Sequence, residues 1–176
     1  MKHYGVETER VLDVGCALGY LTKRLVPAFR EVHGVDISEY GIGEATKQAP
    51  SAVFSVVDLD AEPLPYQDGF FDLVTAYDVL EHTRSMEKTF AEISRVLRPG
   101  GYLFMSVPVR DSLLWKLFAL QEHDLSHVSI LSFSEISSII ERTGFEVLRR
   151  RGFLNFFFAK IPFIPLEYEF DLRKRE

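Results

Sequence analysis

A glycine loop between a buried strand and a helix constrains the fold of this chain more than any other feature. Val11–Val14 is a short apolar run that ends at Gly15, and Gly19 opens an amphipathic helical pattern. Such a run, stopped by glycine, predicts a buried strand. In open α/β sheets, a turn of this kind lies at the carboxyl end of a strand, beside the crevice where ligands bind. The loop therefore indicates an α/β fold with a binding site at one edge of a sheet.

Further strands and helices alternate along the rest of the chain. Apolar runs predict strands at residues 31–35, 52–57, 70–76, 102–107 and 145–148, and apolar periodicity predicts helices at residues 38–48, 86–97 and 134–143. The strands are too apolar to face water on either side, which favours a parallel sheet with helices on both faces. We therefore expect one α/β domain over residues 1–176, with a doubly wound, mostly parallel, seven-stranded sheet.

Charge and cysteine content narrow the function classes. The formal net charge is -6, so the chain lacks the general basic character of proteins that bind nucleic acid. Cys16 is the single cysteine and excludes an internal disulfide, which favours a reducing, cytoplasmic setting. The N-terminal residues lack the apolar stretch of a signal peptide, and no window has the roughly 18 apolar residues of a spanning helix.

An acidic strand end points to an adenosine-bearing cofactor. The second strand ends at Asp36, and a carboxylate there can accept hydrogen bonds from a ribose diol, as in the fingerprint that places an acid about 20 residues after the glycine loop. The dinucleotide fingerprint is G-x-G-x-x-G, whereas this loop reads G-x-x-x-G, with Ala17 and Leu18 inside. The missing glycines argue against an NAD-dependent oxidoreductase.

Five motifs follow one another over about residues 9–108. They are Val11–Gly19, Gly34–Ser38, Val57–Asp60, Phe71–Val74 with Val79–His82, and Leu97–Gly101. The ordered set resembles class I S-adenosylmethionine-dependent methyltransferases, and most closely the small-molecule enzymes that include those of quinone biosynthesis. The resemblance implies a Rossmann-like methyltransferase fold, S-adenosylmethionine as the cofactor, and a substrate-side part over residues 109–176.

The resemblance also implies which residues form the cofactor site. They are Asp13, Gly15, Ala17, Gly19, Asp36, Ile37, Asp58, Leu59 and Tyr77. In the family, the Asp36 position binds the ribose hydroxyls and the Asp58 position accepts from the adenine amino group, with Ile37 and Leu59 against the ring. The Tyr77 position lies near the methionine end. Ala17 departs from the family pattern, because it replaces the central glycine and restricts the backbone.

Three residues are candidates for the base that a hydroxyl acceptor would need. Glu81 and His82 match the family's E-H pair, although they can also serve to shape the loop after the fourth strand. His127 precedes the last long helix, where related enzymes place substrate residues, and histidine can act as a base near neutral pH. His123 shares that segment, and both histidines have an alternative role as capping groups. Zinc ligation by His123, Asp124 and His127 matches no usual spacing, so no metal is predicted.

The last quarter of the chain is rich in aromatic residues between Phe153 and Phe170. We expect most of them to be buried, in a seventh strand antiparallel to the sixth or against a second copy of the chain. The alternative is a surface for a lipophilic substrate, a membrane or a partner. Pro162 and Pro165 exclude a spanning helix. The sequence therefore predicts methyl transfer to a small, lipophilic acceptor; the alternative function is a non-catalytic binding or scaffold module with the same fold.

Overall fold

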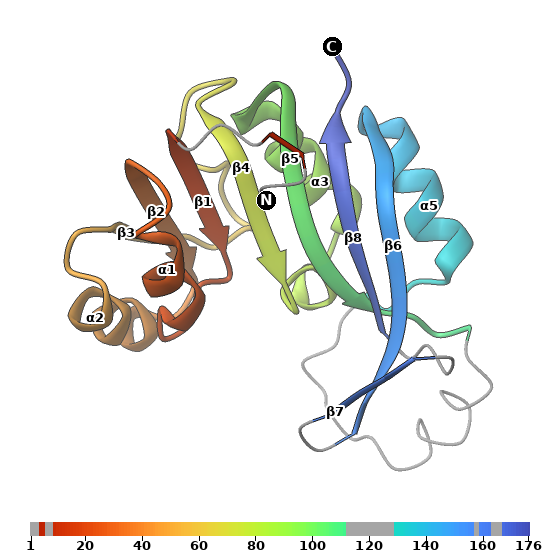
Figure 1. Cartoon of the computed structure of the whole chain (residues 1–176), viewed down its shortest axis with the longest axis horizontal. Coiled ribbons are helices and arrows are strands. Elements are labelled where there is room, and N and C mark those ends of the chain that lie inside the picture. The colour runs from red at the N-terminus through yellow and green to blue at the C-terminus, as the bar shows by residue number, and fades with distance from the viewer. Residues whose placement is uncertain (1–3, 6–8, 112–128, 157–158, 163–166) are drawn as a thin grey trace.

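The protein forms a single sheet flanked by helices (Figure 1). The structure, a computed structural model, describes residues 4–5, 9–111, 129–156, 159–162 and 167–176. Its elements in chain order are β1 (Arg10–Val14), α1 (Tyr20–Leu25), β2 (Glu31–Asp36), α2 (Glu39–Gln48), β3 (Val53–Val56), β4 (Phe71–Tyr77), the 3₁₀ helix η1 (Leu80–His82), α3 (Met86–Val96), β5 (Leu97–Pro108), α5 (Phe133–Arg142), β6 (Phe145–Phe156), β7 (Ala159–Pro162) and β8 (Glu167–Lys174).

The strand order confirms the predicted fold class. The sheet has eight strands in the order β3-β2-β1-β4-β5-β8-β6-β7, and β1 to β5 are parallel. The chain leaves β1 on one side towards β2 and later returns on the other side with β4, so the order reverses beside β1. Doubly wound sheets bind their ligands at this point, outside the carboxyl ends of the strands.

The far half of the sheet differs from the prediction in two respects. The expected antiparallel partner of the sixth strand is present as β8, which also pairs antiparallel with β5 and so lies inside the sheet. A further short strand, β7, pairs with the end of β6 and makes the strand count eight rather than seven. Figure 1 shows this β6–β7 hairpin extending beyond the edge where β4 ends.

One turn was predicted in the wrong place. The residues Arg98–Gly101 were expected to separate helix α3 from the fifth strand, but α3 ends at Val96 and β5 already begins at Leu97. The glycines are accommodated as an irregularity, since the register between β4 and β5 shifts between Phe71 and Leu73. A shift of this kind lets the chain absorb extra residues without leaving the sheet.

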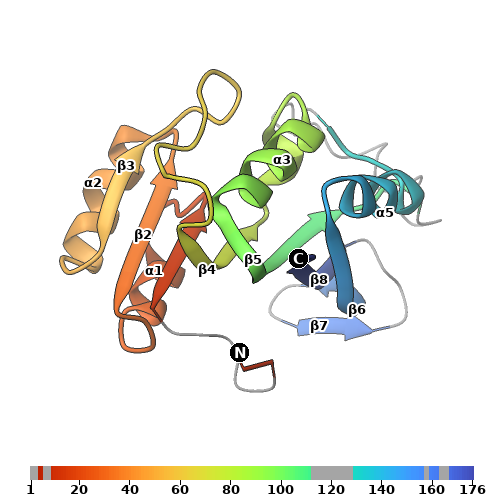
Figure 2. The ribbon, with the colours of Figure 1, turned by 90° about the horizontal axis from the view of Figure 1, so that it is seen from above.

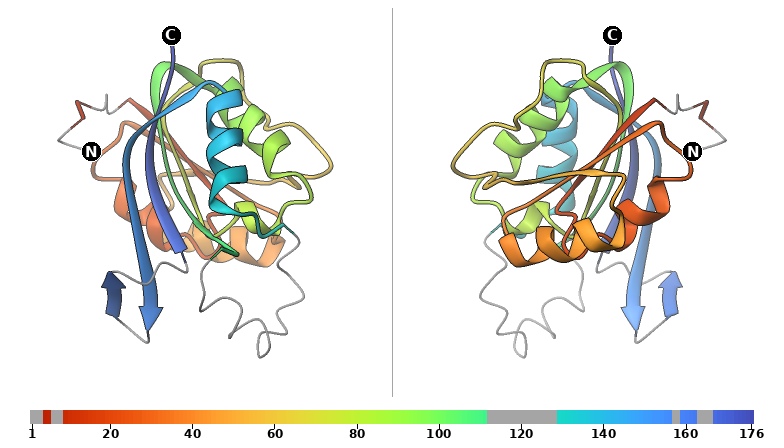
Figure 3. Two further views of the ribbon diagram at one scale, coloured as in Figure 1. Left: turned by 90° about the vertical axis from the view of Figure 1, so that its right-hand side faces the viewer. Right: turned by 90° about the vertical axis from the view of Figure 1, so that its left-hand side faces the viewer.

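Helices cover both faces, as the alternation of strands and helices predicts. Figures 2 and 3 show α3 and α5 on one face and α1 on the other. On the first face, Phe90 of α3 and Ile136 of α5 are fully buried against strand residues such as Leu103. On the second face, Leu25 and Phe29 pack against the other side of the sheet. α2 packs beside α1 and β3.

The aromatic end is buried where the structure describes its side chains. Phe153 and Phe170 are 4% and 1% exposed, and Tyr168 is partly buried. Phe170 belongs to the core under α5, where its ring and that of Phe133 are stacked 6.2 Å apart. The prediction of burial is confirmed for these residues, and the side chains of residues 154–166 lie outside the described part. Within the described part, no helix is long and apolar enough to span a membrane.

Candidate functional site

The glycine loop is fixed by its neighbours on both sides. Gly15 has a φ of 72° and Gly19 a φ of 78°, values that favour glycine. A Cβ atom on Gly15 would lie 2.6 Å from the Val79 side chain, and one on Gly19 would lie 2.8 Å from Ala45 of α2. The two glycines therefore allow the segment after β4 to approach β1, and allow α1 to pack against α2.

Asp13 holds the start of this loop from inside the protein. It is 2% exposed and accepts hydrogen bonds from Thr22 Oγ1 at 2.6 Å and Thr75 Oγ1 at 2.8 Å. Burial raises the pKa of the Asp13 carboxyl, and the two hydroxyl donors oppose that shift. The side chain thus joins β1 to α1 and β4 beneath the loop. The sequence did not single out Thr22 or Thr75, because neither belongs to a motif.

Asp36 holds the loop from the other side. Its two carboxylate oxygens accept from the backbone N–H groups of Ala17, at 2.8 Å, and Ser38, at 2.9 Å. Ala17 adopts a φ of 46°, which L-residues other than glycine, asparagine and aspartate rarely take. The alanine in place of the central glycine is therefore accommodated in a strained conformation. Each carboxylate oxygen has two lone pairs, so Asp36 can still accept from a ligand.

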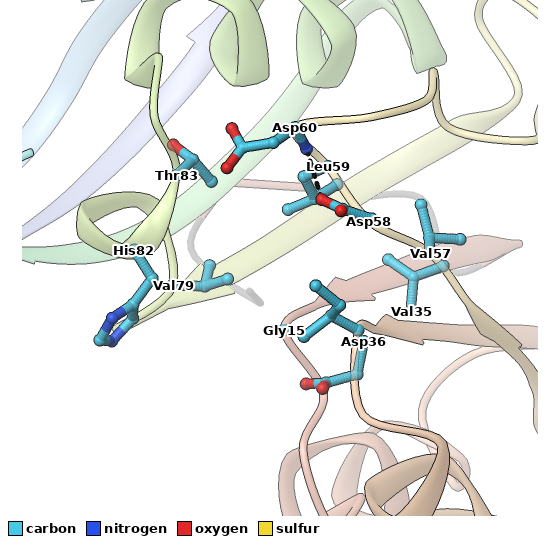
Figure 4. A pocket seen from close by; sticks show the side chains of 11 residues that line it. Gly15, Val35, Asp36, Val57, Asp58, Leu59, Asp60, Val79, His82 and Thr83 are labelled. Carbon is cyan, nitrogen blue, oxygen red and sulfur yellow. Dashed lines mark hydrogen bonds between the residues drawn. The ribbon is translucent and has the colours of Figure 1, made fainter. Parts of the chain in front are cut away.

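A cavity of about 110 Å³ opens beside this loop (Figure 4). Residues from the loop after β1, from β2 and the residue after it, and from the segments after β3 and β4 surround it. They are Gly15, Val35, Asp36, Ile37, Val57, Asp58, Leu59, Asp60, Val79, His82 and Thr83. The cavity therefore combines apolar surfaces that suit a flat ring with carboxylates that suit hydroxyl and amino donors.

The acidic turn after β3 is anchored to the segment after β4. Asp58 Oδ1 accepts from the Asp60 N–H at 2.9 Å, and Asp60 Oδ1 accepts from the Arg84 N–H at 2.8 Å. These bonds leave the second oxygen of the Asp58 carboxylate available at the cavity. Asp60 and Thr83, which the motifs did not mark as binding residues, line the cavity as well.

The end of β4 lies next to the cavity rather than in its lining. Tyr77 is 37% exposed, and burial raises the pKa of its hydroxyl to about 12, with Glu169 and Asp171 adding to the effect. The phenol therefore stays protonated at neutral pH. Asp78 has a φ of 52° and accepts from Ser106 Oγ at 2.6 Å. Backbone strain of this kind is common at functional sites.

Glu81 and His82 occupy different environments although they are adjacent. His82 is exposed and lines the cavity. Glu81 is 3% exposed, and its Oε2 has no hydrogen-bond partner among the described residues. Burial raises the pKa of the Glu81 carboxyl to about 7. The Ser129 N–H donates to the Glu81 carbonyl at 3.0 Å, and Ser129 Oγ donates to the Thr83 carbonyl.

Of the predicted site residues, Gly15, Asp36, Ile37, Asp58, Leu59 and His82 come together around the cavity. Asp13, Ala17 and Gly19 shape its loop from behind, and Tyr77 and Glu81 lie beside it. His123, Asp124 and His127 lie outside the described residues. Within the described ranges, no three His, Cys, Asp or Glu side chains gather as metal ligands.

Known proteins share both the sequence and the fold. Residues 12–105 match the family described as "Methyltransferase domain". The chain is 29% identical over 165 residues to a ubiquinone biosynthesis O-methyltransferase of Aromatoleum aromaticum, which covers 86% of this chain and 70% of the relative. It is 32% identical over 149 residues to a 27-O-demethylrifamycin SV methyltransferase of Amycolatopsis mediterranei, with 78% of this chain and 54% of that protein covered.

Solved structures agree on the fold. An S-adenosylmethionine-dependent methyltransferase from Mesorhizobium loti aligns with a TM-score of 0.77 at 18% identity, over 98% of this chain and 95% of the other. At this identity the likeness concerns the fold alone. The chain thus spans nearly the whole of that structure, but about half of the rifamycin enzyme.

Proposed function

This chain belongs to the methyltransferase domain family, and we propose that it transfers the methyl group of S-adenosylmethionine to a hydroxyl of a small, lipophilic molecule. The observation that carries the proposal is the cavity at the point where the strand order reverses, with Asp36 on one side and Asp58 and Leu59 on another. It offers acceptors for a ribose and an adenine amino group, together with apolar surface for the adenine ring.

Different residues would bind different parts of the cofactor. Asp36 would accept from the ribose hydroxyls while it holds the Ala17 N–H. Asp58 would accept from the adenine amino group, with Ile37 and Leu59 against the ring. Tyr77, at the end of β4, would lie near the methionine end, where its protonated phenol can donate a hydrogen bond.

The bound cofactor supplies a methyl group on a positively charged sulfur, which leaves as a neutral thioether. The protein would hold the acceptor oxygen in line with that methyl group, so that the oxygen–carbon bond would replace the sulfur–carbon bond, and a base would take the hydroxyl proton. Alignment of oxygen, carbon and sulfur is the main task of the protein. His82 and Glu81 are the proposed bases within the described residues, since one lines the cavity and the other has a pKa near 7. His127 remains a proposed base as well.

Two features support a lipophilic acceptor that carries a hydroxyl. The relatives named above are O-methyltransferases of ubiquinone biosynthesis and of a rifamycin. In addition, the β6–β7 hairpin extends beyond the carboxyl edge of the sheet, on the side of β5 away from the cofactor cavity (Figure 1). The sequence between Phe153 and Phe170 is also rich in phenylalanine, which suits a lipophilic acceptor.

The proposal can be tested with labelled cofactor. The protein is incubated with methyl-labelled S-adenosylmethionine and a set of phenolic and polyketide-like hydroxyl compounds, and with non-hydroxylated analogues of each. Label should pass to the hydroxyl compounds alone. Cofactor binding without transfer to any acceptor, including a total lipid extract, would favour the non-catalytic binding module.

Replacing the β6–β7 hairpin tests the acceptor site without changing the cofactor site. Phe153 pairs directly with Glu167, so residues 154–166 can be replaced by an Asn-Gly turn that closes β6 onto β8. The shortened protein should still fold and bind S-adenosylhomocysteine, but should lose transfer to lipophilic acceptors. Unchanged transfer would exclude the hairpin from the acceptor site.

We also propose a cytoplasmic location and self-association through the aromatic C-terminal part. Light scattering of the parent and of the shortened protein tests the self-association.

A further inference from the structure

Two residues of α3 hold the segment that follows the acidic turn. Arg95 donates to the carbonyl oxygens of Leu64, at 2.8 Å, and Tyr66, at 2.7 Å, and to the Asp68 carboxylate at 2.9 Å. Glu92 accepts from the Leu64 N–H at 3.1 Å and from Arg95 at 2.9 Å. The Glu92–Arg95 pair therefore contacts both backbone polar groups of Leu64.

The segment held by this pair is continuous with the cavity lining. Val57 to Asp60 line the cavity, and Leu64 follows after three residues and is 2% exposed. On the cavity side, the Arg84 N–H holds Asp60. The connection from β3 to β4 has no helix or strand of its own. Its position therefore depends on the anchors at Asp60 and at Leu64 to Asp68.

The guanidinium is suited to this role by its shape. It is planar and presents five N–H donors in a fixed arrangement, so Arg95 can bind two carbonyls and two carboxylates at once. A lysine has the same charge but a single ammonium group, and cannot reproduce the arrangement. Hydrogen bonds that Glu92 accepts from Arg95 also hold the pKa of Glu92 below its usual range, which keeps the carboxylate ionised.

We propose that Glu92 and Arg95 are positioning residues for the cofactor: by holding Leu64 to Asp68, they fix Asp58 and Leu59 against the adenine. Neither side chain lines the cavity. Without the pair, the cofactor would have to order the connection when it binds, and part of the binding free energy would be lost to that ordering.

The test compares Arg95→Lys and Glu92→Gln with a matched control, Arg142→Lys. Arg142 of α5 pairs with Glu87 of α3 at 3.1 Å and makes no described hydrogen bond to the connection. The dissociation constant of S-adenosylhomocysteine is measured by calorimetry well below the unfolding temperature of each protein. We expect it to rise about tenfold in Arg95→Lys, which corresponds to about 1.4 kcal/mol, and to stay within about twofold in the control.

A double-mutant cycle distinguishes positioning from general destabilisation. If the pair acts through the adenine side, Arg95→Lys should cost much less affinity in a Leu59→Ala background, but its full cost in an Asp36→Ala background. Hydrogen exchange should increase at residues 58–69 in Arg95→Lys and Glu92→Gln.

Unchanged affinity in both folded variants, or equal losses in both backgrounds, would overturn the proposal. If Arg95→Lys does not fold, Glu92→Gln alone decides. A parent protein that does not bind S-adenosylhomocysteine would instead contradict the cofactor site itself.

Discussion

The backbone N–H of Ala17 donates to the Asp36 carboxylate over 2.8 Å and thereby joins the glycine loop to the end of the neighbouring strand. The other oxygen of Asp36 accepts from the Ser38 N–H, at the start of α2. The carboxylate proposed to bind ribose thus already orders the loop and the helix that flank the cavity. Removing this carboxylate should therefore weaken ligand binding and also leave the glycine loop less ordered in the ligand-free protein.

Asp36→Ala should weaken S-adenosylhomocysteine binding by roughly ten- to a hundredfold, since a hydrogen bond to a charged group contributes about 1.5–3 kcal/mol. Calorimetry measures the effect, and hydrogen exchange should also increase at Ala17 because its acceptor is lost. Glu39→Ala, which removes an exposed carboxylate from the first turn of α2, serves as the control. Equal affinities for all three proteins would contradict the placement of the ribose.

Ala17→Gly should stabilise the protein. A left-handed conformation costs an L-residue about 1–2 kcal/mol, while the extra freedom of glycine in the unfolded chain offsets about 0.4–1 kcal/mol. We expect a net gain of roughly 0–1.6 kcal/mol in the free energy of unfolding, measured in urea. Ala17→Val should act in the opposite direction, because a β-branched side chain tolerates positive φ poorly. A loss of stability in Ala17→Gly would show that the φ of 46° carries no strain.

Glu81→Gln should be more stable than the parent above pH 7. The pKa of Glu81 is raised from 4.5 to about 7, chiefly by burial. Between these values the folded state keeps a proton that the unfolded state has released, so the stability of the parent falls as pH rises through this window. One pKa unit corresponds to about 1.4 kcal/mol, so the difference should reach a few kcal/mol.

The measurement for Glu81 is the midpoint of thermal unfolding from pH 4 to 9. The two curves should converge as the pH falls below 4.5, because the carboxyl is then protonated in both states. Glu87→Gln, at an exposed position of α3, provides the comparison and should follow the parent. If the Glu81→Gln and parent curves run parallel, the carboxyl is not buried as described.

His33 should make the protein sensitive to acid. It is 8% exposed, its ring lies 5.3 to 5.8 Å from the rings of Tyr66, Phe70 and Phe71, and its Nδ1 has no hydrogen-bond partner among the described residues. Burial lowers the pKa of His33, and Glu31 opposes the shift. Below the usual value of 6.5 the unfolded state gains a proton that the folded state does not, so stability falls as pH falls.

Replacing His33 tests this directly. His33→Phe should lose the part of the acid sensitivity that begins at about pH 6.5, when unfolding is followed by circular dichroism between pH 5 and 8. His82→Gln, which changes an exposed histidine, should keep it. The same acid sensitivity in His33→Phe and in the parent would assign the effect to other groups.

The half of the sheet that carries the cavity could be predicted from the sequence, because each strand there is a short apolar run that ends in a recognisable residue. Gly15, Asp36 and Asp58 all follow or end apolar runs, and all three line the cavity. The roles of Thr22, Thr75 and Arg95 could not be predicted in this way. Their contacts depend on residues that belong to other elements of the fold. Threonine and arginine are also common at positions with no such role.

The position of β8 in the sheet could not be predicted from the sequence pattern for a different reason. An apolar run predicts a strand, but its partners depend on which edges of the sheet are free when it arrives. Antiparallel pairing with β6 follows from their proximity in the chain, whereas insertion between β5 and β6 does not. The irregular start of β5 was missed because Pro99 and Gly100 ordinarily indicate a turn.

The inserted strand gives the sheet a second seam between distant parts of the chain. β1 pairs with β4 across two intervening strands, with Leu12 opposite Val74, and β8 brings Arg173 opposite Tyr102. Contacts between distant residues form slowly, because closing the long loop costs entropy before the contacts compensate for it. The β1–β2–β3 unit, the β4–β5 pair and the β6–β8 hairpin can therefore form first, since each joins neighbouring segments. On this basis the β1–β4 and β5–β8 seams should be the last parts of the sheet to close on refolding and the first to open on unfolding.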